Sequence, residues 1–422
     1  MSTIGGANII QDGLVFGYDA DDRSTRYYPG EPTTNMVTNT DLTTWSENDT
    51  VLTENGMVNI DHHSFMSYKL TTDTGNSTHR LYAGQGAILS TSTNYNISLY
   101  AKANGYNYIT FGMTDNTYYQ TQTTFNLLNG DVELDYTSSG GTIIDSSSNY
   151  IGKGWYRLNL TISLSTYITA NYFLMMVLDS VKNPPQTSWT SDGVSGILVS
   201  SPQIELKSHT TPYTPTSRSS TQGLLDLTGN NTIDLSNMSF DSTAHPIFDS
   251  TSQYISIDVD SWIRNVDYVT LTGWYYHNSL TSGAPWGIMT DVPGTGTSDG
   301  FWWHIAYTDG TILYLRTEDS TSGESGVSGT PFVSSGNWYH LTTIVGNSKF
   351  IIYVNGNLNW DWDTNVPFSW ANINSDTAYL TVGLSYTTSI NGKIPVFKLY
   401  NKALTQTEIT QNFNATRNRF SI

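Results

Sequence analysis

Residues 337–358 read NWYHLTTIVGNSKFIIYVNGNL and predict two β-strands with a turn after each. Side chains alternate along the first strand, so that Trp338 and His340 fall on one face and Leu341 on the other, the period-two pattern of a strand in a sheet. A reversal at 346–348 leads into a second alternating strand. Asn355-Gly356 then supplies the two residues with positive φ that a tight type I′ hairpin needs. The stretch therefore predicts an antiparallel sheet.

The composition favours an all-β protein with more than one domain. The chain has 422 residues, which is more than one ordinary hydrophobic core accommodates. With 18 Lys and Arg against 36 Asp and Glu, the net charge of −18 argues against nucleic acid or an anionic membrane as partner. Only 13% of residues are charged, while 35 glycines and 28 tyrosines suit many short strands joined by turns. There is no cysteine, no visible signal peptide and no apolar run long enough to span a bilayer, so we expect a soluble chain without disulfides.

The hairpin stretch belongs to a longer series of motifs. It is followed by LTVG at 380–383 and by GKIPVFKLYNKALTQTE at 392–408. This series resembles the laminin G-like (concanavalin A-like) jelly roll, and more narrowly the version found in structural proteins of tailed bacteriophages, whose closing segment is similar to residues 400–420. The resemblance implies a jelly-roll β-sandwich. Thr405 and Glu408 also predict a capping box at the start of a single convincing helix.

The opening of the same domain lies far from its continuation. GLVFGYD at 13–19 resembles the first strand of the phage laminin G-like domain, whose next motifs appear only at 225–232 and 247–257. We therefore expect one split jelly roll formed by 12–34 plus 217–422, preceded by an N-terminal arm at 1–11, with a second domain at 35–216 inserted at a loop, where insertion is tolerated. The alternative is a linear order of arm, domain and domain.

The inserted segment has its own strand pattern. Alternating segments are predicted at 95–101, 106–112, 125–128, 132–136, 155–164 and 172–178. GWYR at 154–157, SPQIE at 201–205 and TPYTPT at 211–216 make the segment similar to the carbohydrate-binding-module-like jelly rolls of phage virion proteins. The predicted fold class is thus all-β, with two jelly-roll sandwiches of the concanavalin A/laminin G-like type, one inserted into the other.

Tryptophans near loops and sheet edges are the candidate carbohydrate- or partner-binding residues. An exposed indole beside a carboxylate can stack on a sugar ring while the carboxylate binds hydroxyls. Adjacent Trp302 and Trp303 cannot both face inward on a strand, so one of them is expected to be exposed or to lie against a partner. An interface between subunits is the alternative, because interfaces also enrich tryptophan. The candidates are Trp302, Trp303, Trp360, Asp361, Trp362 and Trp370.

Three carboxylates on one predicted strand, Asp131, Glu133 and Asp135, are the only catalytic candidates. They resemble the acidic strand of concanavalin-like glucanases, in which carboxylates act as nucleophile and acid. The segment follows an Asn-Gly turn, and Val132 and Leu134 fit a half-buried strand with a wet face. We favour a surface strand and assign no catalytic residue, and a glycosidase stays an alternative.

No cofactor is required by these motifs, although calcium could bind. Oxygen ligands could come from Asp19, Asp21 and Asp22, or from Asp226 with Asn230, because some laminin G-like domains bind calcium at the sandwich rim. Hydrated turns are the commoner explanation of such residues. We therefore assign no metal ligand.

The resemblance implies a non-enzymatic decoration or structural protein of a phage virion, made in the bacterial cytoplasm and placed on the capsid, neck or tail. Its implied partners are other virion proteins, further copies of itself and cell-surface glycans, but neither nucleic acid nor membrane. The alternatives are a purely structural virion protein without glycan binding and a tail-associated glycan depolymerase. The residues expected to dock it on the particle are Ser2, Thr3, Ile4, Gly5, Gly6, Ala7 and Asn8.

Overall fold

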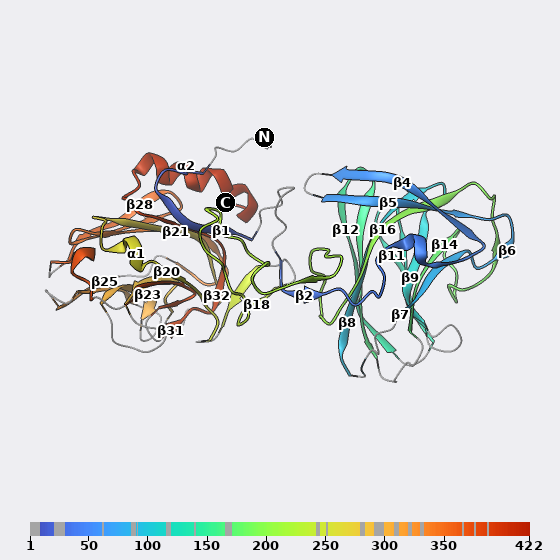
Figure 1. The fold of residues 1–422 in the computed structure, drawn as a ribbon, viewed down its shortest axis with the longest axis horizontal. Coiled ribbons are helices and arrows are strands. Elements are labelled where there is room, and N and C mark those ends of the chain that lie inside the picture. The colour runs from blue at the N-terminus through green and yellow to red at the C-terminus, as the bar shows by residue number, and fades with distance from the viewer. Residues whose placement is uncertain are drawn as a thin grey trace. The chain divides into compact units, whose positions relative to one another are not determined.

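The computed structural model divides the chain into two compact units, each described here by itself (Figure 1). Unit 1 contains β1 (Leu14–Asp19) and the chain from Ser219 to Ile422, and unit 2 contains Thr33–Arg218. The structure describes residues 9–20, 30–60, 63–85, 90, 92–114, 120–138, 141–164, 171–241, 245–249, 252–278, 283–290, 299–307, 312–319, 323–329, 333–364, 367–374, 377–385 and 388–422. No helix in these ranges is both long and apolar enough to cross a membrane.

Unit 1 is a sandwich of two antiparallel sheets. The helix-side sheet has the order β18 (Ser239–Phe240), β19 (Pro246–Phe248), β32 (Gly392–Tyr400), β21 (Val269–His277), β26 (Trp338–Gly346), β27 (Lys349–Val354) and β28 (Asn357–Asp363), with β1 also paired to β32. The second sheet has the order β20 (Ile255–Asp258), β29 (Tyr379–Val382), β22 (Trp286–Met289), β23 (Gly300–Tyr307), β24 (Ile312–Asp319) and β25 (Gly323–Gly329). The short elements are α1 (Asp260–Ile263), η2 (Trp370–Asn372), β30 (Leu384–Ser385) and β31 (Thr388–Ser389).

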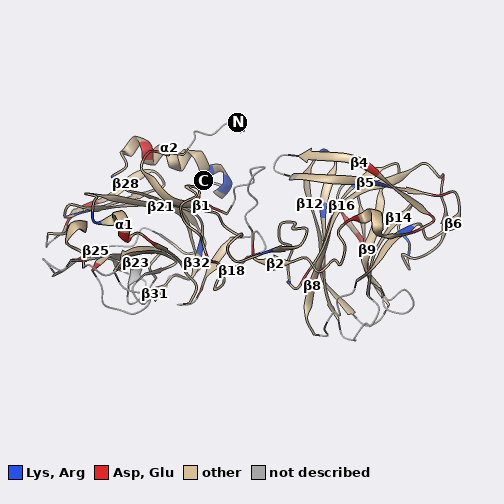
Figure 2. Ribbon diagram, viewed as in Figure 1, with Lys and Arg blue, Asp and Glu red and all other residues tan. Residues whose placement is uncertain are grey.

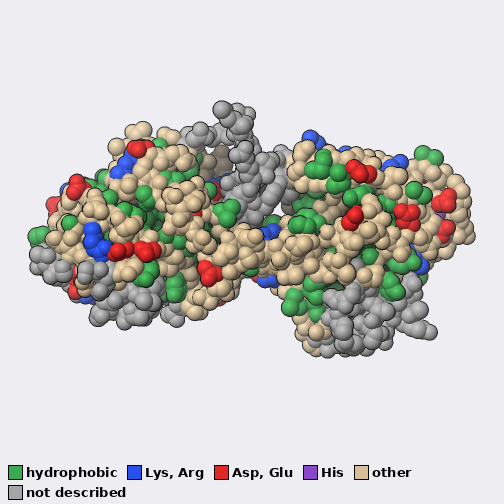
Figure 3. Space-filling view, viewed as in Figure 1, with side chains coloured by type: hydrophobic (Ala, Val, Ile, Leu, Met, Phe, Trp, Pro, Cys, Tyr) green, Lys and Arg blue, Asp and Glu red, His purple; other side chains and the backbone are tan. Residues whose placement is uncertain are grey.

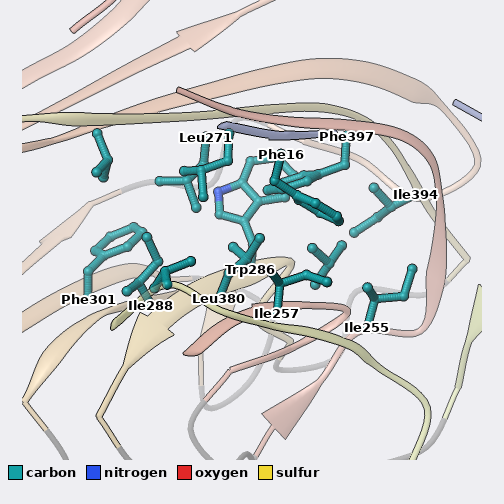
Figure 4. Close-up of a cluster of buried hydrophobic side chains, with 14 of the residues drawn as sticks. Phe16, Ile255, Ile257, Leu271, Trp286, Ile288, Phe301, Leu380, Ile394 and Phe397 are labelled. Carbon is teal, nitrogen blue, oxygen red and sulfur yellow. The ribbon is translucent and has the colours of Figure 1, made fainter. Parts of the chain in front are cut away.

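The core of unit 1 lies between these sheets. Figure 4 shows Phe16, Leu271 and Phe397 of the helix-side sheet facing Ile288 and Leu380 of the second sheet across the Trp286 indole. The rings of Trp286 and Phe397 are 5.4 Å apart. Because Phe16 comes from β1, the start of the chain contributes directly to a core that is otherwise built from residues after 219.

The two turns of the stretch 337–358 determine the register of β26, β27 and β28. Asn347 and Ser348 reverse the chain with φ of 44° and 62°, and Asn355 and Gly356 do so with φ of 51° and 78°. The prediction of two positive-φ residues at Asn355-Gly356 is confirmed. The predicted alternation is confirmed as well, since Leu341 enters the core while His340 points to the opposite face.

That opposite face is covered by the C-terminal helix α2 (Gln406–Thr416) and the turn η3 (Arg417–Phe420). The predicted capping box is confirmed, because Thr405 accepts from the Glu408 amide while the Glu408 side chain accepts from the Thr405 amide. Trp274 stacks on Phe420 at 4.2 Å and donates from Nε1 to Thr416 Oγ1 at 2.7 Å. The outer face of the helix-side sheet is thus closed by the chain itself.

Unit 2 is a second sandwich. One sheet, which we name the clasp-side sheet after the segment 206–214 that covers its outer face, has the order β12 (Gly141–Gly152), β13 (Trp155–Leu164), β8 (Asn94–Asn104), β16 (Gly196–Glu205), β5 (His63–Thr72) and β4 (Thr50–Ile60). The other, the tyrosine sheet, has the order β11 (Val132–Thr137), β10 (Gln120–Asn126), β9 (Tyr108–Thr114), β14 (Asn171–Leu178), β7 (Arg80–Gln85) and β3 (Ser46–Asn48). The short elements are η1 (Leu42–Thr44), β2 (Thr33–Thr34) paired with β17 (Ser217–Arg218), and β6 (Asn76–Ser77) paired with β15 (Trp189–Thr190). The all-β prediction of jelly-roll sandwiches is therefore confirmed.

Candidate functional site

Trp302 and Trp303 are both buried, with exposed fractions of 1% and 0%, so the expectation that one of them is exposed is wrong. The physical reason is that side chains lie against both faces of β23. Trp303 enters the core beside Trp286, with ring centroids 5.7 Å apart. Trp302 points to the other face, where the guanidinium of Arg316 lies 4.7 Å from its ring centroid.

Trp370 is fully buried too. Its indole Nε1 donates to the carbonyl oxygen of Val345 at 3.1 Å, and its ring contacts Phe368 at 5.0 Å. A buried, hydrogen-bonded indole stabilises the core but presents no surface on which a ligand can stack. In this fold, the three buried tryptophans therefore act in packing.

Trp360 and Trp362 are half-buried on the edge strand β28. Their ring centroids are 3.8 Å apart, and both rings pack against the core of unit 1. Asp361 points to the opposite face of the strand, where Lys349 Nζ lies 3.1 Å from its Oδ1. An indole and a carboxylate on one face, as predicted for a sugar site, are thus not formed by these residues, and a binding role for the Trp360–Trp362 edge stays a prediction.

Other predicted residues have structural partners or lie outside the described ranges. The arm Ser2 to Asn8 is outside them, so its docking role stays a prediction. On the exposed strand β11, Glu133 accepts from Asn126 Nδ2 at 3.0 Å, and Asp135 accepts from Thr123 Oγ1 at 2.7 Å. These contacts join the strand to its neighbour and fit the interpretation of a surface strand.

The oxygen atoms considered for calcium are used within the fold. Asp226 accepts from Gly17 N at 3.1 Å, Thr228 Oγ1 at 2.6 Å and Asn231 Nδ2 at 2.8 Å, and therefore holds its loop against β1. Asp19 pairs with Arg419, while Asp21 and Asp22 lie outside the described residues. Within the described ranges, no group of three or more His, Asp or Glu side chains is placed to hold a metal ion.

The outer face of the clasp-side sheet is covered by a segment that we name the clasp (residues 206–214). Gln203 Oε1 accepts from Thr214 N at 2.8 Å, and Glu205 Oε2 accepts from Thr211 N at 3.0 Å. Burial raises the pKa of Glu205, while the hydrogen bonds from Thr211 oppose that rise. Arg157 of the GWYR motif donates to Ser98 Oγ at 2.6 Å on the same face. The side chains of Gln203 and Glu205 therefore hold the clasp against the outer face of its own sheet.

We name the outer face of the tyrosine sheet the tyrosine face. Phenol rings stand half-exposed around buried, uncharged side chains. The half-exposed members are Tyr82, Tyr108, Tyr136 and Tyr172, and the buried members are Thr110, Gln122, Thr124, Leu174 and Met176. The strand register places them in rows across the sheet. Half-exposed tyrosines gathered on one sheet face fit a ligand rich in hydroxyl groups.

Two rows define the centre of this face. Gln122 lies between Tyr136 on β11 and Gly112 on β9, and Leu174 follows on β14. In the neighbouring row, the hydroxyls of Thr110 and Thr124 are 2.6 Å apart. At the far end, the Arg80 guanidinium lies 5.2 Å from the ring centroid of Tyr82. Charged residues are sparse along the ribbons of both units (Figure 2), and on the face drawn in Figure 3 they are scattered among uncharged polar atoms.

Sequence reasoning missed this face for a physical reason. Strand β10 reads QTQTTFN, so polar side chains occupy both of its faces, and no hydrophobic alternation reveals it before Phe125. Its inward threonines are buried by the opposite sheet, while its outward Gln122 is buried by neighbours that only the sheet order brings together. The regular polar spacing of Gln120, Gln122 and Thr124 was the one signal that could have revealed the face.

Comparisons with known proteins support the fold of unit 1. Residues 249–410 match the family model described as the Concanavalin A-like lectin/glucanases superfamily. Unit 1 thus carries a laminin G-like, concanavalin A-like jelly-roll domain with a lectin-like fold. Among curated proteins, none matches the chain.

Solved structures of similar fold are distant. The NanB sialidase from Streptococcus pneumoniae matches 37% of this chain at 18% identity with a TM-score of 0.29, and this chain covers only 26% of that protein. The Ruminococcus gnavus IT-sialidase CBM40 bound to α2,3 sialyllactose matches 37% at 12% identity and a TM-score of 0.31, covering 90% of that chain. Domain 4 of AbnA, a GH43 extracellular arabinanase from Geobacillus stearothermophilus in complex with arabinotriose, matches 44% at 19% identity and a TM-score of 0.31, covering 82%. We base no argument on likenesses of this size.

Proposed function

We propose that this chain is a non-catalytic glycan-binding protein that displays lectin-like β-sandwiches on the particle of a tailed bacteriophage. The observation that carries the glycan-binding part is the tyrosine face. Half-exposed phenol rings can pack on the CH groups of a sugar, and their own hydroxyl groups can exchange hydrogen bonds with its hydroxyls. The covered face of unit 2, by contrast, is occupied by the clasp.

The virion part of the proposal rests on the sequence resemblance of residues 400–420 to phage structural proteins. Its partners would be other virion proteins of the capsid, neck or tail and further copies of the chain. Many copies on one particle would multiply a weak contact between each tyrosine face and a cell-surface glycan. The proposal includes no catalytic step and no role for nucleic acid or membrane.

A purely structural role without glycan binding is the second candidate. Its supporting observation is the burial of Trp302, Trp303 and Trp370, which leaves these lectin-like positions of unit 1 without an exposed aromatic platform. For this candidate, the half-buried Trp360–Trp362 edge would lie against a neighbouring subunit. The two candidates therefore differ in whether the tyrosine face binds a sugar.

A glycan array tests the first candidate directly. The full chain, clustered on beads to imitate display on a particle, should bind at least one class of immobilised oligosaccharide. Absence of binding to every neutral and acidic glycan would leave the structural candidate. Mass spectrometry of purified phage particles tests the second part, since the chain must be found there in many copies.

A further inference from the structure

Three partly exposed side chains form a row on the outer face of the helix-side sheet, beside η3. Lys393 of β32 lies opposite Tyr276 of β21, which in turn lies opposite Trp338 of β26. The adjacent residues Ile394 and Tyr275 enter the core of unit 1, so Lys393 and Tyr276 point outward. Trp338 points to the same face, because its ring packs on Phe420 of η3 at 4.7 Å. The row thus combines an ammonium group, a phenol and an indole.

The turn between β18 and β19 brings two more side chains to this row. Within the turn, His245 N donates to Asp241 Oδ1 at 3.0 Å, and Asp241 N donates to the carbonyl oxygen of His245 at 3.1 Å. Asp241 Oδ2 lies 2.6 Å from Lys393 Nζ. The His245 imidazole lies 5.9 Å from the Trp338 ring and almost perpendicular to it. The turn therefore contacts both ends of the row.

The remaining contacts close a circuit of five side chains, which we name the unit 1 patch (Asp241, His245, Tyr276, Trp338 and Lys393). The rings of Tyr276 and Trp338 are 5.1 Å apart, and Lys393 Nζ lies 5.5 Å from the centroid of the Tyr276 ring. The side chains of Asp241, His245 and Lys393 are 16%, 14% and 25% exposed, and the two aromatic residues are partly exposed. All five members thus reach the surface, where a ligand can contact them directly.

We propose that the unit 1 patch binds one residue of a neutral sugar. Tyrosine and tryptophan offer an apolar ring for the CH groups of a sugar together with a polar N–H or O–H group. An ammonium group has three N–H donors, and the contact with Asp241 uses one of those of Lys393. A carboxylate accepts hydrogen bonds and an ammonium donates them, so this ion pair can bind hydroxyl groups, which do both. The inference rests on the proposed function and adds to it a second site, on the other unit, with its class of ligand.

The arrangement of charge favours a neutral sugar over an acidic one. Asp241 lies between Lys393 and His245, so a carboxylate-bearing sugar that approached Lys393 would bring a second negative charge beside Asp241. The patch also has the combination that the Trp360–Trp362 edge lacks, because its indole and its carboxylate belong to one connected set of side chains on one face. A role confined to holding the β18–β19 turn against the sheet is the alternative that the test has to exclude.

The test uses the full chain and matched pairs of variants. Asp241→Asn removes the carboxylate of the patch at constant size, and Tyr276→Ala removes its phenol. The control for the first is Asp12→Asn, because Asp12 of unit 1 also has a carboxylate oxygen 2.6 Å from a lysine ammonium, that of Lys402. The control for the second is Tyr150→Ala, which removes an exposed tyrosine of unit 2. The probes are neutral oligosaccharides of galactose, glucose or mannose and sialylated oligosaccharides, first on an array and then in titration calorimetry.

We expect the wild type to bind a neutral oligosaccharide, Asp241→Asn and Tyr276→Ala to lose at least about tenfold in affinity for it, and both controls to bind as the wild type does. A second measurement needs no variant. In the wild type, saturating amounts of that oligosaccharide should slow the acetylation of Lys393 by an activated ester and leave that of Lys402 unchanged, as followed by mass spectrometry of peptides. A cluster that only holds the turn would give no protection, and this measurement decides the question if either variant fails to fold.

Other results would overturn the assignment and remain distinguishable from failure of the proposed function. If the wild type binds a neutral sugar that neither protects Lys393 nor depends on Asp241, glycan binding stands and the unit 1 patch is not its site. Loss of all binding in Tyr136→Ala, a variant of the tyrosine face, would likewise leave that face as the site. Binding of sialylated probes alone would contradict the neutral class of ligand. Absence of any binding by the wild type would remove both proposals.

Discussion

The guanidinium of Arg419 holds the carboxylate of Asp19 through two hydrogen bonds, from Nη1 to Oδ1 at 2.9 Å and from Nη2 to Oδ2 at 2.7 Å. Asp19 ends β1 and Arg419 belongs to η3, so this pair joins the first strand of unit 1 to its last turn. Bidentate geometry makes such pairs stronger than ordinary surface ion pairs. The side chains are 31% and 15% exposed, so solvent weakens the attraction only in part.

A double-mutant cycle with Asp19→Asn and Arg419→Gln should therefore give a coupling free energy of about 1 kcal/mol in urea unfolding. The same cycle on Lys349 and Asp361, which are 39% and 47% exposed, is the control and should give less than about 0.5 kcal/mol. Equal coupling free energies in the two cycles would mean that the bidentate Asp19–Arg419 pair stabilises the fold no more than an ordinary surface ion pair does.

His340 is buried beneath α2, on the outer face of the helix-side sheet. Burial, with a smaller contribution from the charge of Lys398, lowers the pKa of His340 from 6.5 to about 3. Its Nε2 lies 3.3 Å from Thr272 Oγ1, and its Nδ1 has no partner among the described residues. Lys398 lies on the same face, and burial lowers its pKa from 10.5 to about 8. Burial therefore shifts both groups towards their neutral forms, and at pH 7 His340 is neutral while Lys398 still carries its charge.

The sign of the His340 effect follows from proton binding. Below pH 6.5 the unfolded chain binds a proton at His340, whereas the folded chain does not bind it until about pH 3. The contribution of His340 to the unfolding free energy therefore decreases as the pH falls through this range. Relative to the wild type, His340→Leu should gain on the order of 3 kcal/mol in unfolding free energy between pH 7 and pH 4. Parallel stability curves for the two proteins over this range would contradict the placement of a neutral His340.

Titration of Lys398 also makes the unfolding free energy rise with pH, in a second pH range. Between about pH 8 and pH 10.5, the unfolded chain keeps a proton that the folded chain has lost, so the stability contributed by this group rises with pH. Lys398→Met should remove that rise, which thermal unfolding at pH 7.5, 9 and 10.5 can measure. If the wild type and Lys398→Met respond identically to these changes, the lysine is charged in the folded state.

The corrected placement of the tryptophans predicts their costs on truncation. Trp302→Ala and Trp303→Ala should each lower the unfolding free energy by about 3–5 kcal/mol, because both leave a cavity in packed surroundings. Trp360→Ala, at a half-buried edge, should cost about 1–2 kcal/mol. Chemical unfolding followed by circular dichroism measures all three. A cost at Trp302 no larger than that at Trp360 would show that Trp302 is solvated.

The features predicted correctly from sequence are those set by short-range chemistry. Asn355-Gly356 is the pair that a type I′ turn with two positive φ angles prefers, and Thr405 with Glu408 caps a helix using only its own first turn. Strand β13 was likewise predicted with its observed bounds, because its sequence begins and ends with the apolar residues Trp155 and Leu164. In these cases the neighbours that determine the structure are present in the sequence window itself.

The errors and omissions arise where distant segments meet. The inference about Trp302 and Trp303 assumed that a strand has one buried face, whereas Arg316, from the next strand, covers the second. The burial of Gln122 was not predicted because it is a property of the assembled sheet, in which Gly112 and Tyr136 lie on two other strands. Local sequence patterns predict helices, strands and turns, but they do not predict which side chains of distant segments come into contact.

The pairing of β1 with β32, in which Leu14 lies opposite Tyr400, has a consequence for biosynthesis. On the ribosome, β1 emerges among the first strands, yet its partner emerges only after the whole of unit 2 and most of unit 1. At ordinary translation rates, this separation lasts on the order of tens of seconds. All six strands of each unit 2 sheet emerge within that interval, so unit 2 can fold while Phe16 and Tyr18 still lack the core that buries them. The nascent chain thus carries an apolar strand without its sheet throughout the synthesis of unit 2 and of most of unit 1.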